Sequence, residues 1–223
     1  MTGPLSILAG VAAAALSLAV STANADIFIG LQQNDDPIQT VASGPGFVIF
    51  DDPFGEFESV AVAGFGQPST VPPTLLQVGN VSINNEDGDA GTLTVYVTST
   101  GNTDPLGLLE FISNLGTFEL TPGWTATLET YVDPGNGVYA LTTLLGSAFF
   151  TDVAFDLDTA IANAGGGPYS KTAVIRITAP TEGVARPSVS LAATAVPEPA
   201  SLALLSAALA GLGIIARRRR RAA

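Results

Sequence analysis

The segment TLTVYVT, residues 92–98, decides the fold class of this 223-residue chain. Its apolar residues Leu93, Val95 and Val97 alternate with threonines and Tyr96, which is the period of two that a β-strand requires. One face of this strand must therefore point into a hydrophobic core. We expect the face that carries the threonines and the tyrosine to be solvated.

A polar turn, residues 84–90, separates this strand from an earlier strand-like segment, residues 75–83, and the order predicts a β-hairpin with a long acidic tip. The carboxylates of Glu86, Asp87 and Asp89 are hard oxygen ligands of the kind that calcium binds, so these residues are the candidate metal ligands. Their spacing does not match an EF-hand loop. A solvated turn rich in Asn, Asp and Gly explains the same composition more simply.

Further strand-like runs, rich in Val, Ile, Thr and Phe and separated by Gly, Pro, Asn and Asp, continue along the chain. They comprise residues 26–32, 47–50, 57–65, 124–132, 138–145, 149–155, 171–178 and 188–195. The unbroken apolar run at residues 47–50 is typical of a strand buried on both faces or in a sandwich core. Together these runs predict an all-β domain over residues 26–194. We expect an antiparallel β-sandwich of the jelly-roll or immunoglobulin-like kind.

Two short segments have features of helices. Residues 105–113 carry leucines and an isoleucine at helical spacing. Residues 158–164 begin with Asp158, a suitable N-cap, and stop before three glycines. We expect each segment to form a turn or two of helix in a loop across one end of the sandwich.

Composition excludes several kinds of chemistry. The chain has no cysteine and no histidine, so thiolate catalysis, the Ser-His-Asp triad and the usual zinc ligands are absent. Between residues 26 and 196 there are three basic residues against 19 acidic ones, a charge that repels phosphate backbones. We therefore predict a protein that is not an enzyme, has no catalytic residues, does not bind nucleic acid and requires no cofactor, calcium being the one candidate ion.

Three weaker alternatives concern the aromatic and acidic residues. Four aromatic side chains are candidates for a sugar-stacking platform, although core packing is the commoner role of a lone tryptophan; they are Trp124, Tyr131, Tyr139 and Tyr169. The pairs at residues 35–36 and 51–52 each precede a proline, which indicates turns, and a joint metal site is the alternative. A hydrolase that uses two carboxylates is a further alternative, but no spacing rule selects a pair.

The N-terminal residues 1–25 have the composition of a cleaved secretory signal peptide. An alanine-rich apolar run ends in Ala23 and Ala25, the small residues that signal peptidase requires at its cleavage site. The run departs from the usual pattern because no lysine or arginine precedes it.

The C-terminal residues 195–223 contain three successive signals. Residues 196–199 read VPEP, residues 200–216 form an uncharged apolar run, and five arginines follow. The run is near the lower length limit of a transmembrane helix, and the arginines orient it with the β domain outside the cytoplasm. The residues that define the motif are Pro197, Glu198, Pro199, Arg217, Arg218, Arg219, Arg220 and Arg221.

These three parts, in this order, resemble the PEP-CTERM sorting signal of Gram-negative bacteria. The resemblance implies recognition by exosortase, processing near Pro-Glu-Pro, and attachment at or release from the cell surface. Such proteins are usually linked to exopolysaccharide, biofilm or floc matrix. We therefore expect signal peptidase and exosortase as processing partners, exopolysaccharide as a binding partner, and transient contact with the inner membrane.

The expected precursor is anchored in the inner membrane with its β domain on the periplasmic side. The mature product is then a cell-surface or extracellular-matrix protein without catalytic activity. A carbohydrate- or calcium-binding module is the alternative function, followed by a carboxylate-dependent hydrolase.

Overall fold

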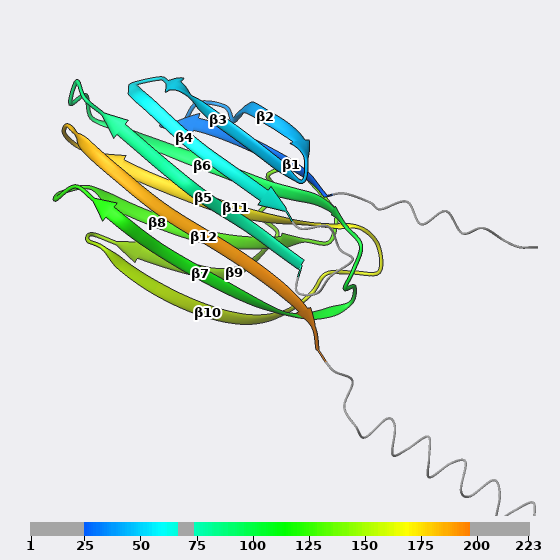
Figure 1. Ribbon diagram of the computed structural model, residues 1–223. Helices are drawn as coiled ribbons and strands as arrows, with labels where there is room; N and C mark the ends of the chain where they lie inside the picture. Colours follow the sequence, from blue (N-terminus) through cyan, green and yellow to red (C-terminus); the bar gives the residue numbers. More distant parts are fainter. Residues whose placement is uncertain (1–24, 67–73, 197–223) are drawn as a thin grey trace, which may run out of the picture.

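The computed structural model describes residues 25–66 and 74–196, and these residues form two antiparallel sheets packed face to face, with no helix (Figure 1). The first sheet has the order β2 (Gln39–Pro45), β1 (Asp26–Gln33), β6 (Gly91–Asn102), β11 (Tyr169–Ala179), β8 (Thr125–Asp133) and β9 (Thr143–Phe150). The second sheet has the order β10 (Ala154–Asn163), β7 (Leu108–Leu120), β12 (Gly183–Ala195), β5 (Thr74–Asn85), β4 (Phe57–Gly66) and β3 (Phe47–Phe54). The predicted all-β sandwich is confirmed.

The winding of the chain ties the two sheets together. Among the described strands, seven connections between successive strands pass from one sheet to the other. Two six-stranded sheets also exceed the seven or nine strands of immunoglobulin domains. Most neighbouring strands are therefore distant in the sequence, and the core depends on long-range pairing.

The segment at residues 92–98 lies at the centre of the first sheet. Its strand β6 pairs with β1 on one side and β11 on the other. Leu93, Val95 and Val97 are fully buried against the second sheet, as their alternation predicts. A hydroxyl pair, Ser113 on β7 and Thr130 on β8, crosses the core with an O–O distance of 2.6 Å, which satisfies both buried side chains.

The predicted hairpin between residues 75–83 and 91–98 is wrong. The strands β5 and β6 belong to different sheets, and β5 pairs with β4 and β12 instead. The acidic turn is thus a connection across one end of the sandwich. A polar turn between two alternating segments fits both geometries, because the local pattern does not reveal which strand will pair with which.

The prediction of a solvated face on β6 is also wrong, because Thr94, Tyr96 and Thr98 are all buried. The connection between β8 and β9, residues 134–142, lies across the outer face of the first sheet. We call this segment the strap. The ring of its Tyr139 contacts that of Tyr96 at 5.8 Å between centroids. It also lies against Gly30, where a Cβ atom would come within 2.7 Å of the ring.

Both predicted helices are strands. Residues 108–120 form β7, whose Leu109, Phe111 and Leu115 point into the core while Leu108 faces outward. Residues 154–163 form β10, and Asp158 accepts a hydrogen bond from the backbone N–H of Ser147 on β9 instead of capping a helix. Tertiary pairing with neighbouring strands overrides the weak helical spacing of short apolar runs.

The limits of several other strands differ from those predicted. The run at residues 47–50 opens β3, an edge strand whose Phe47 and Ile49 are exposed, so burial on both faces is wrong. Residues 138–142 belong to the strap, so β9 begins only at Thr143. A turn at residues 151–153 divides the predicted strand 149–155 between β9 and β10. Strand β2, at one edge of the first sheet, had no expected counterpart.

Candidate functional site

The acidic turn is organised by hydrogen bonds within the protein. The backbone N–H groups of Glu86 and Asp87 donate to the Glu58 carboxylate at 2.7 and 3.3 Å. These bonds, that from Glu86 foremost, lower the pKa of Glu58. Asn85 closes the turn by accepting from the Gly88 N–H and donating to the Asp89 carbonyl.

Within the described ranges 25–66 and 74–196, no three carboxylates gather into a group that could hold a metal ion. The structure therefore does not assemble Glu86, Asp87 and Asp89 with other acids, or the pairs at 35–36 and 51–52 with each other. Calcium at the turn stays a prediction from composition.

The aromatic platform, the weaker alternative from sequence, does not form, and core packing of the tryptophan is confirmed. Trp124 and Tyr169 are fully buried, and the indole N–H of Trp124 donates to the Thr181 carbonyl. Tyr131 and Tyr139 lie outside the core, on the outer side of the first sheet. Burial raises the pKa of Tyr131 to about 12, helped by its hydrogen bond to Glu129.

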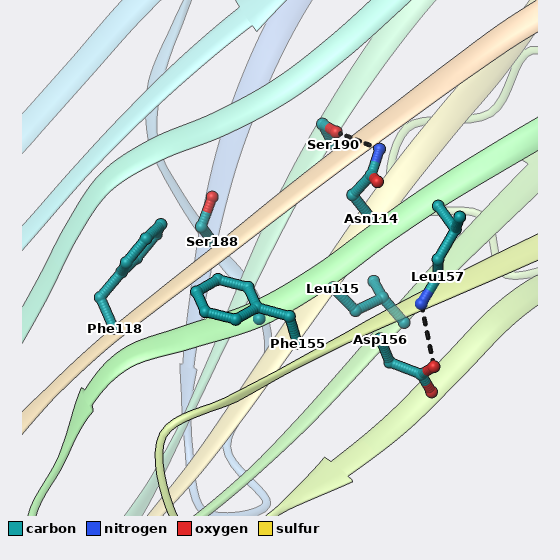
Figure 2. Close-up of a pocket in the computed structure, with 9 residues that line it drawn as sticks. Asn114, Leu115, Phe118, Phe155, Asp156, Leu157, Ser188 and Ser190 are labelled. Carbon is teal, nitrogen blue, oxygen red and sulfur yellow. Dashed lines mark hydrogen bonds between the residues drawn. The ribbon is translucent and has the colours of Figure 1, made fainter.

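A groove of about 440 Å³ on the outer face of the second sheet is the best-formed candidate site (Figure 2). Phe118 and Phe155 bound its apolar part, and both rings are well exposed, at 63% and 65%. The rings meet edge to face with centroids 5.1 Å apart. Polar groups complete the lining, contributed by Asn114, Asp156, Ser188 and Ser190. We call this site the groove.

Strand register explains why these side chains gather. Phe155 on β10 pairs with Gly116 on β7, and Leu157 pairs with Asn114, so both β10 side chains project outward over β7. The Phe155 ring lies directly over Gly116, where any Cβ atom would collide with it. On the other side, Ser190 of β12 pairs with Asn114, whose amide donates to the Ser190 hydroxyl at 3.1 Å. The groove therefore has a rigid sheet as its floor.

Sequence reasoning missed the groove because it assigned residues 114–118 and 156–157 to no strand and could not place β7 between β10 and β12. Alternation along residues 154–161 was the available signal, since Phe155, Leu157 and Ile161 alternate with more polar residues on what proves to be one face. The alternation indicates an outward-facing site only when β10 is known to be an edge strand with its apolar face outward.

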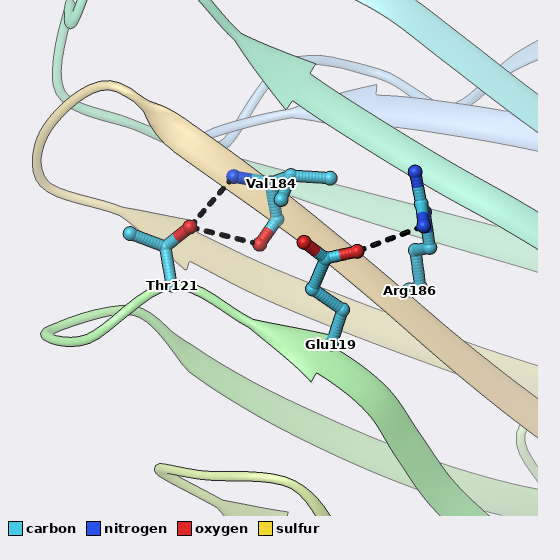
Figure 3. Close-up of polar contacts among 4 residues, drawn as sticks. All are labelled: Glu119, Thr121, Val184 and Arg186. Carbon is cyan, nitrogen blue, oxygen red and sulfur yellow. Dashed lines mark hydrogen bonds and ion pairs between the residues drawn. The ribbon is translucent and has the colours of Figure 1, made fainter.

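Two further hollows are more polar. One, of about 390 Å³ on the first sheet, is lined by Gln32, Asn34, Asp35, Thr92, Arg176 and Thr178. The other, of about 540 Å³, is open and places Glu86 and Glu182 beside Thr121 and Gly183. The Thr121 hydroxyl holds this corner by accepting from the Val184 N–H at 2.8 Å and donating to the Val184 carbonyl at 3.2 Å (Figure 3).

An ion pair lies next to this corner, between Arg186 of β12 and Glu119 of β7 at 2.9 Å (Figure 3). Both side chains are about half exposed, so water screens the attraction and the pair adds at most about 1 kcal/mol. The ion pair joins the neighbouring parts of β7 and β12, and it gives the Arg186 guanidinium a charged partner. This corner therefore has the character of a structural junction.

Lys171 is the most unusual ionisable residue of the described chain. Register places it on the inward side of β11 between Ser99 and Val132, and its side chain is fully buried. Within residues 25–66 and 74–196 its Nζ has no hydrogen-bond partner. Burial lowers its pKa to about 7.

The signals at the chain ends lie mostly outside the described residues. These comprise Ala23, the VPEP residues Pro197, Glu198 and Pro199, the apolar run 200–216 and the arginines 217–221; Ala25 is described and buried. In the parts that the structure covers, no helix has the length and apolar character needed to cross a membrane.

Comparison with family models identifies the C-terminal signal. Residues 195–221 match the PEP-CTERM protein-sorting motif. The chain carries a PEP-CTERM sorting signal. The predicted resemblance is confirmed. The motif implies an exported protein that exosortase sorts and whose sorting signal is anchored in the membrane. No curated protein matches the chain.

Two solved structures show limited similarity to this chain. One concerns mannan recognition by the carbohydrate-binding module TmCBM27; it is 10% identical, covers 67% of this chain and 99% of that chain, and has a TM-score of 0.29. The other is that of infectious bursal disease virus, Gx strain; it is 14% identical, covers 79% and 57%, and has a TM-score of 0.28. Scores this low carry no argument about the fold or the ligand.

Proposed function

We propose that this protein is an exported, exosortase-sorted surface or matrix protein that binds a neutral polysaccharide in the groove and catalyses no reaction. The observation that carries the proposal is the pair of exposed rings, Phe118 and Phe155, beside the amide and hydroxyl groups of Asn114, Ser188 and Ser190. Aromatic rings cover the apolar C–H faces of sugars, and fixed polar groups bind their hydroxyls. A volume of about 440 Å³ accommodates a few sugar units.

Charge supports a neutral ligand. The segment from residue 26 to residue 196 has 19 acidic residues and three basic ones, which disfavours approach of a uronate-rich or sulfated polymer. Asp156 is the acidic residue of the lining, and because it alternates with Phe155 and Leu157 its side chain points to the opposite side of β10. A polymer of uncharged hexoses avoids this repulsion.

The same lining supports a binding role over a hydrolytic one. Glycoside hydrolysis of the usual kind needs two carboxylates facing each other across the sugar bond. Among the residues that line the groove, Asp156 is the acidic one, but its carboxylate points to the other side of β10, where Oδ1 accepts from the Leu157 N–H. Glu86 and Glu182 share a hollow elsewhere, but no aromatic residue lines it.

The proposal is tested by affinity electrophoresis of the exported protein in gels containing soluble mannan, glucan or polysaccharide purified from the producing bacterium. We expect retardation in at least one neutral polymer. Phe155→Ala removes one ring and is expected to weaken binding about tenfold, or about 1.4 kcal/mol.

Gly116→Ala gives an independent check, because its new Cβ displaces the Phe155 ring while every polar group of the groove remains. The matched control is Gly79→Ala on β5, where the nearest atom lies 4.0 Å from the new Cβ. We expect Gly116→Ala to weaken binding and Gly79→Ala to leave it unchanged. Failure of all neutral polymers to retard the folded protein, or equal retardation of every variant, contradicts the proposal.

A further inference from the structure

The point where the chain leaves the sandwich lies beside an exposed leucine. Strand β12 ends at Ala195, and the next residue, Val196, donates its backbone N–H to the Leu108 carbonyl at 3.3 Å. This is the end of the second sheet at which β7 begins and β10 finishes (Figure 1). The sorting motif, residues 195–221, starts at the same place.

Three large apolar side chains are exposed at this end. Leu106, Leu108 and Ile161 are 40%, 56% and 62% exposed, and we call them the exit cluster. The backbone beneath them is fixed, because the Gly107 N–H donates to the Gly165 carbonyl and the Ala164 N–H donates to the Gly107 carbonyl, both at 2.8 Å. The cluster is therefore a fixed apolar surface around the exit.

The length of chain beyond the exit limits how far this surface can be from a bilayer. Three residues, 197–199, separate Val196 from the apolar run that starts at residue 200. Even fully extended, this link spans about 14 Å. The 17-residue run is about 25 Å long as a helix, which is shorter than a hydrocarbon core of about 30 Å. Its first residue must then lie at or inside the hydrocarbon boundary.

The headgroup layer on each side of a bilayer is about 5–8 Å thick, so even a fully extended link keeps the exit end of the sandwich within about 9 Å of it. The described basic side chains do not contribute to this contact. Lys171 is buried, Arg186 is paired with Glu119, and Arg176 lines the hollow on the first sheet. Any binding energy at the exit end must therefore come from apolar burial rather than from attraction to anionic lipid.

We propose that, in the anchored precursor, the exit cluster inserts into the headgroup layer of the membrane and fixes the orientation of the sandwich on the bilayer. Glu110 pairs with both Ile161 and Thr194 in the sheet and is exposed, so its carboxylate limits the depth of insertion to the cluster itself. The contact keeps the Pro-Glu-Pro segment at the membrane surface.

The absence of cysteine allows a direct test with single-cysteine variants of the full chain. The precursor, reconstituted in phosphatidylcholine vesicles, is labelled with an environment-sensitive dye at Leu108→Cys, at Val153→Cys or at Ala208→Cys. Val153 is similarly exposed, at 51%, but lies in the turn before β10, at the opposite end of that strand. Lipids that carry a nitroxide near the headgroup then quench any dye that reaches the membrane.

We expect strong quenching at residue 108, with a blue shift of emission, and little at residue 153. Both effects should persist in 0.5 M salt, since apolar contact is not screened. The dye at residue 208 should be quenched by nitroxides placed deep in the acyl chains, which checks that the sorting signal is inserted. Equal quenching at residues 108 and 153, or no deep quenching at residue 208, overturns the proposal. Neither result bears on polysaccharide binding in the groove.

Discussion

Lys171 shows how strongly one residue can depend on its surroundings. A lysine between polar residues in the sequence gives no hint of burial, yet strand alternation turns it into the core beside Ala173. Removing an ammonium group from water without a partner is costly, so the folded state favours the neutral amine. This cost of burying the charged form lowers the pKa of Lys171 to about 7.

We predict that Lys171→Met stabilises the protein by about 2 kcal/mol or more at pH 7, measured by urea unfolding. In the wild type, the unfolded lysine holds its proton up to its ordinary pKa of 10.5, whereas the folded one releases it near 7. The unfolded state therefore binds more protons between these values, and wild-type stability rises with pH from 7 toward 10. The advantage of the methionine should shrink over the same range.

Arg176→Met is the matched control, because Arg176 lies on the same strand but is exposed. It should change the free energy of unfolding by no more than about 0.5 kcal/mol and should not alter its pH dependence. A Lys171→Met protein that is less stable than wild type at pH 7 would show that the amine is paired and charged.

At the scale of elements, the strap shows how a connection between two strands can cover the outer face of a sheet. Asp133, at the end of β8, accepts from the Thr142 hydroxyl at 2.7 Å and from the Gly137 N–H at 2.8 Å, so it holds the middle and the far end of the strap. The Tyr139 N–H donates to Thr98 beneath it. Burial by itself raises the pKa of Asp133, but these hydrogen bonds outweigh it and lower the pKa.

We predict that Asp133→Ala releases the strap and costs about 1–3 kcal/mol of stability near neutral pH. Because the folded pKa is depressed, the contribution is present above the ordinary value of 3.8 and is lost as the pH falls through the lower folded value. Amide hydrogen exchange should speed up at Gly137 and Tyr139 before it does elsewhere in the first sheet. Asp152→Asn is the control, since the Asp152 carboxylate accepts from the adjacent Val153 N–H alone among the described residues, and strap exchange should not change. Unchanged strap exchange in Asp133→Ala contradicts this role.

Elements were predictable where the sequence of a strand has one apolar and one more polar face. Strands β1, β4, β6, β8 and β11 were all expected close to their actual limits. The errors at β7 and β10 have different causes. Strand β7 carries apolar residues on both faces, which obscures the alternation, whereas β10 alternates but turns its apolar side outward. The pairing of β5 with β4 and β12, rather than with β6, leaves no local trace in the sequence.

The behaviour of the whole molecule depends on its C-terminal signal. Pro197 and Pro199 cannot donate to a sheet ladder or continue a helix, so we expect a processing enzyme to act at this segment. We predict that mass spectrometry of the protein from its native host finds an N-terminus at Asp26 and a C-terminus upstream of residue 200. Replacing Glu198 with alanine should cause the precursor to accumulate, whereas Glu182→Ala should be processed normally. A mature chain that retains Arg217–Arg221 would contradict processing and indicate a permanent anchor.

The sequence by itself determined the fold class and the sorting of this protein. Both depend on local patterns: alternation along strands such as residues 92–98, and three contiguous signals within residues 195–221. Only the tertiary structure decided the groove, the strap and the position of Lys171. Each of these depends on pairs such as Phe155 with Gly116, or Lys171 with Ser99, that are far apart in the chain. Which strands become neighbours is set by the packing of two complete sheets, and no local segment carries that information.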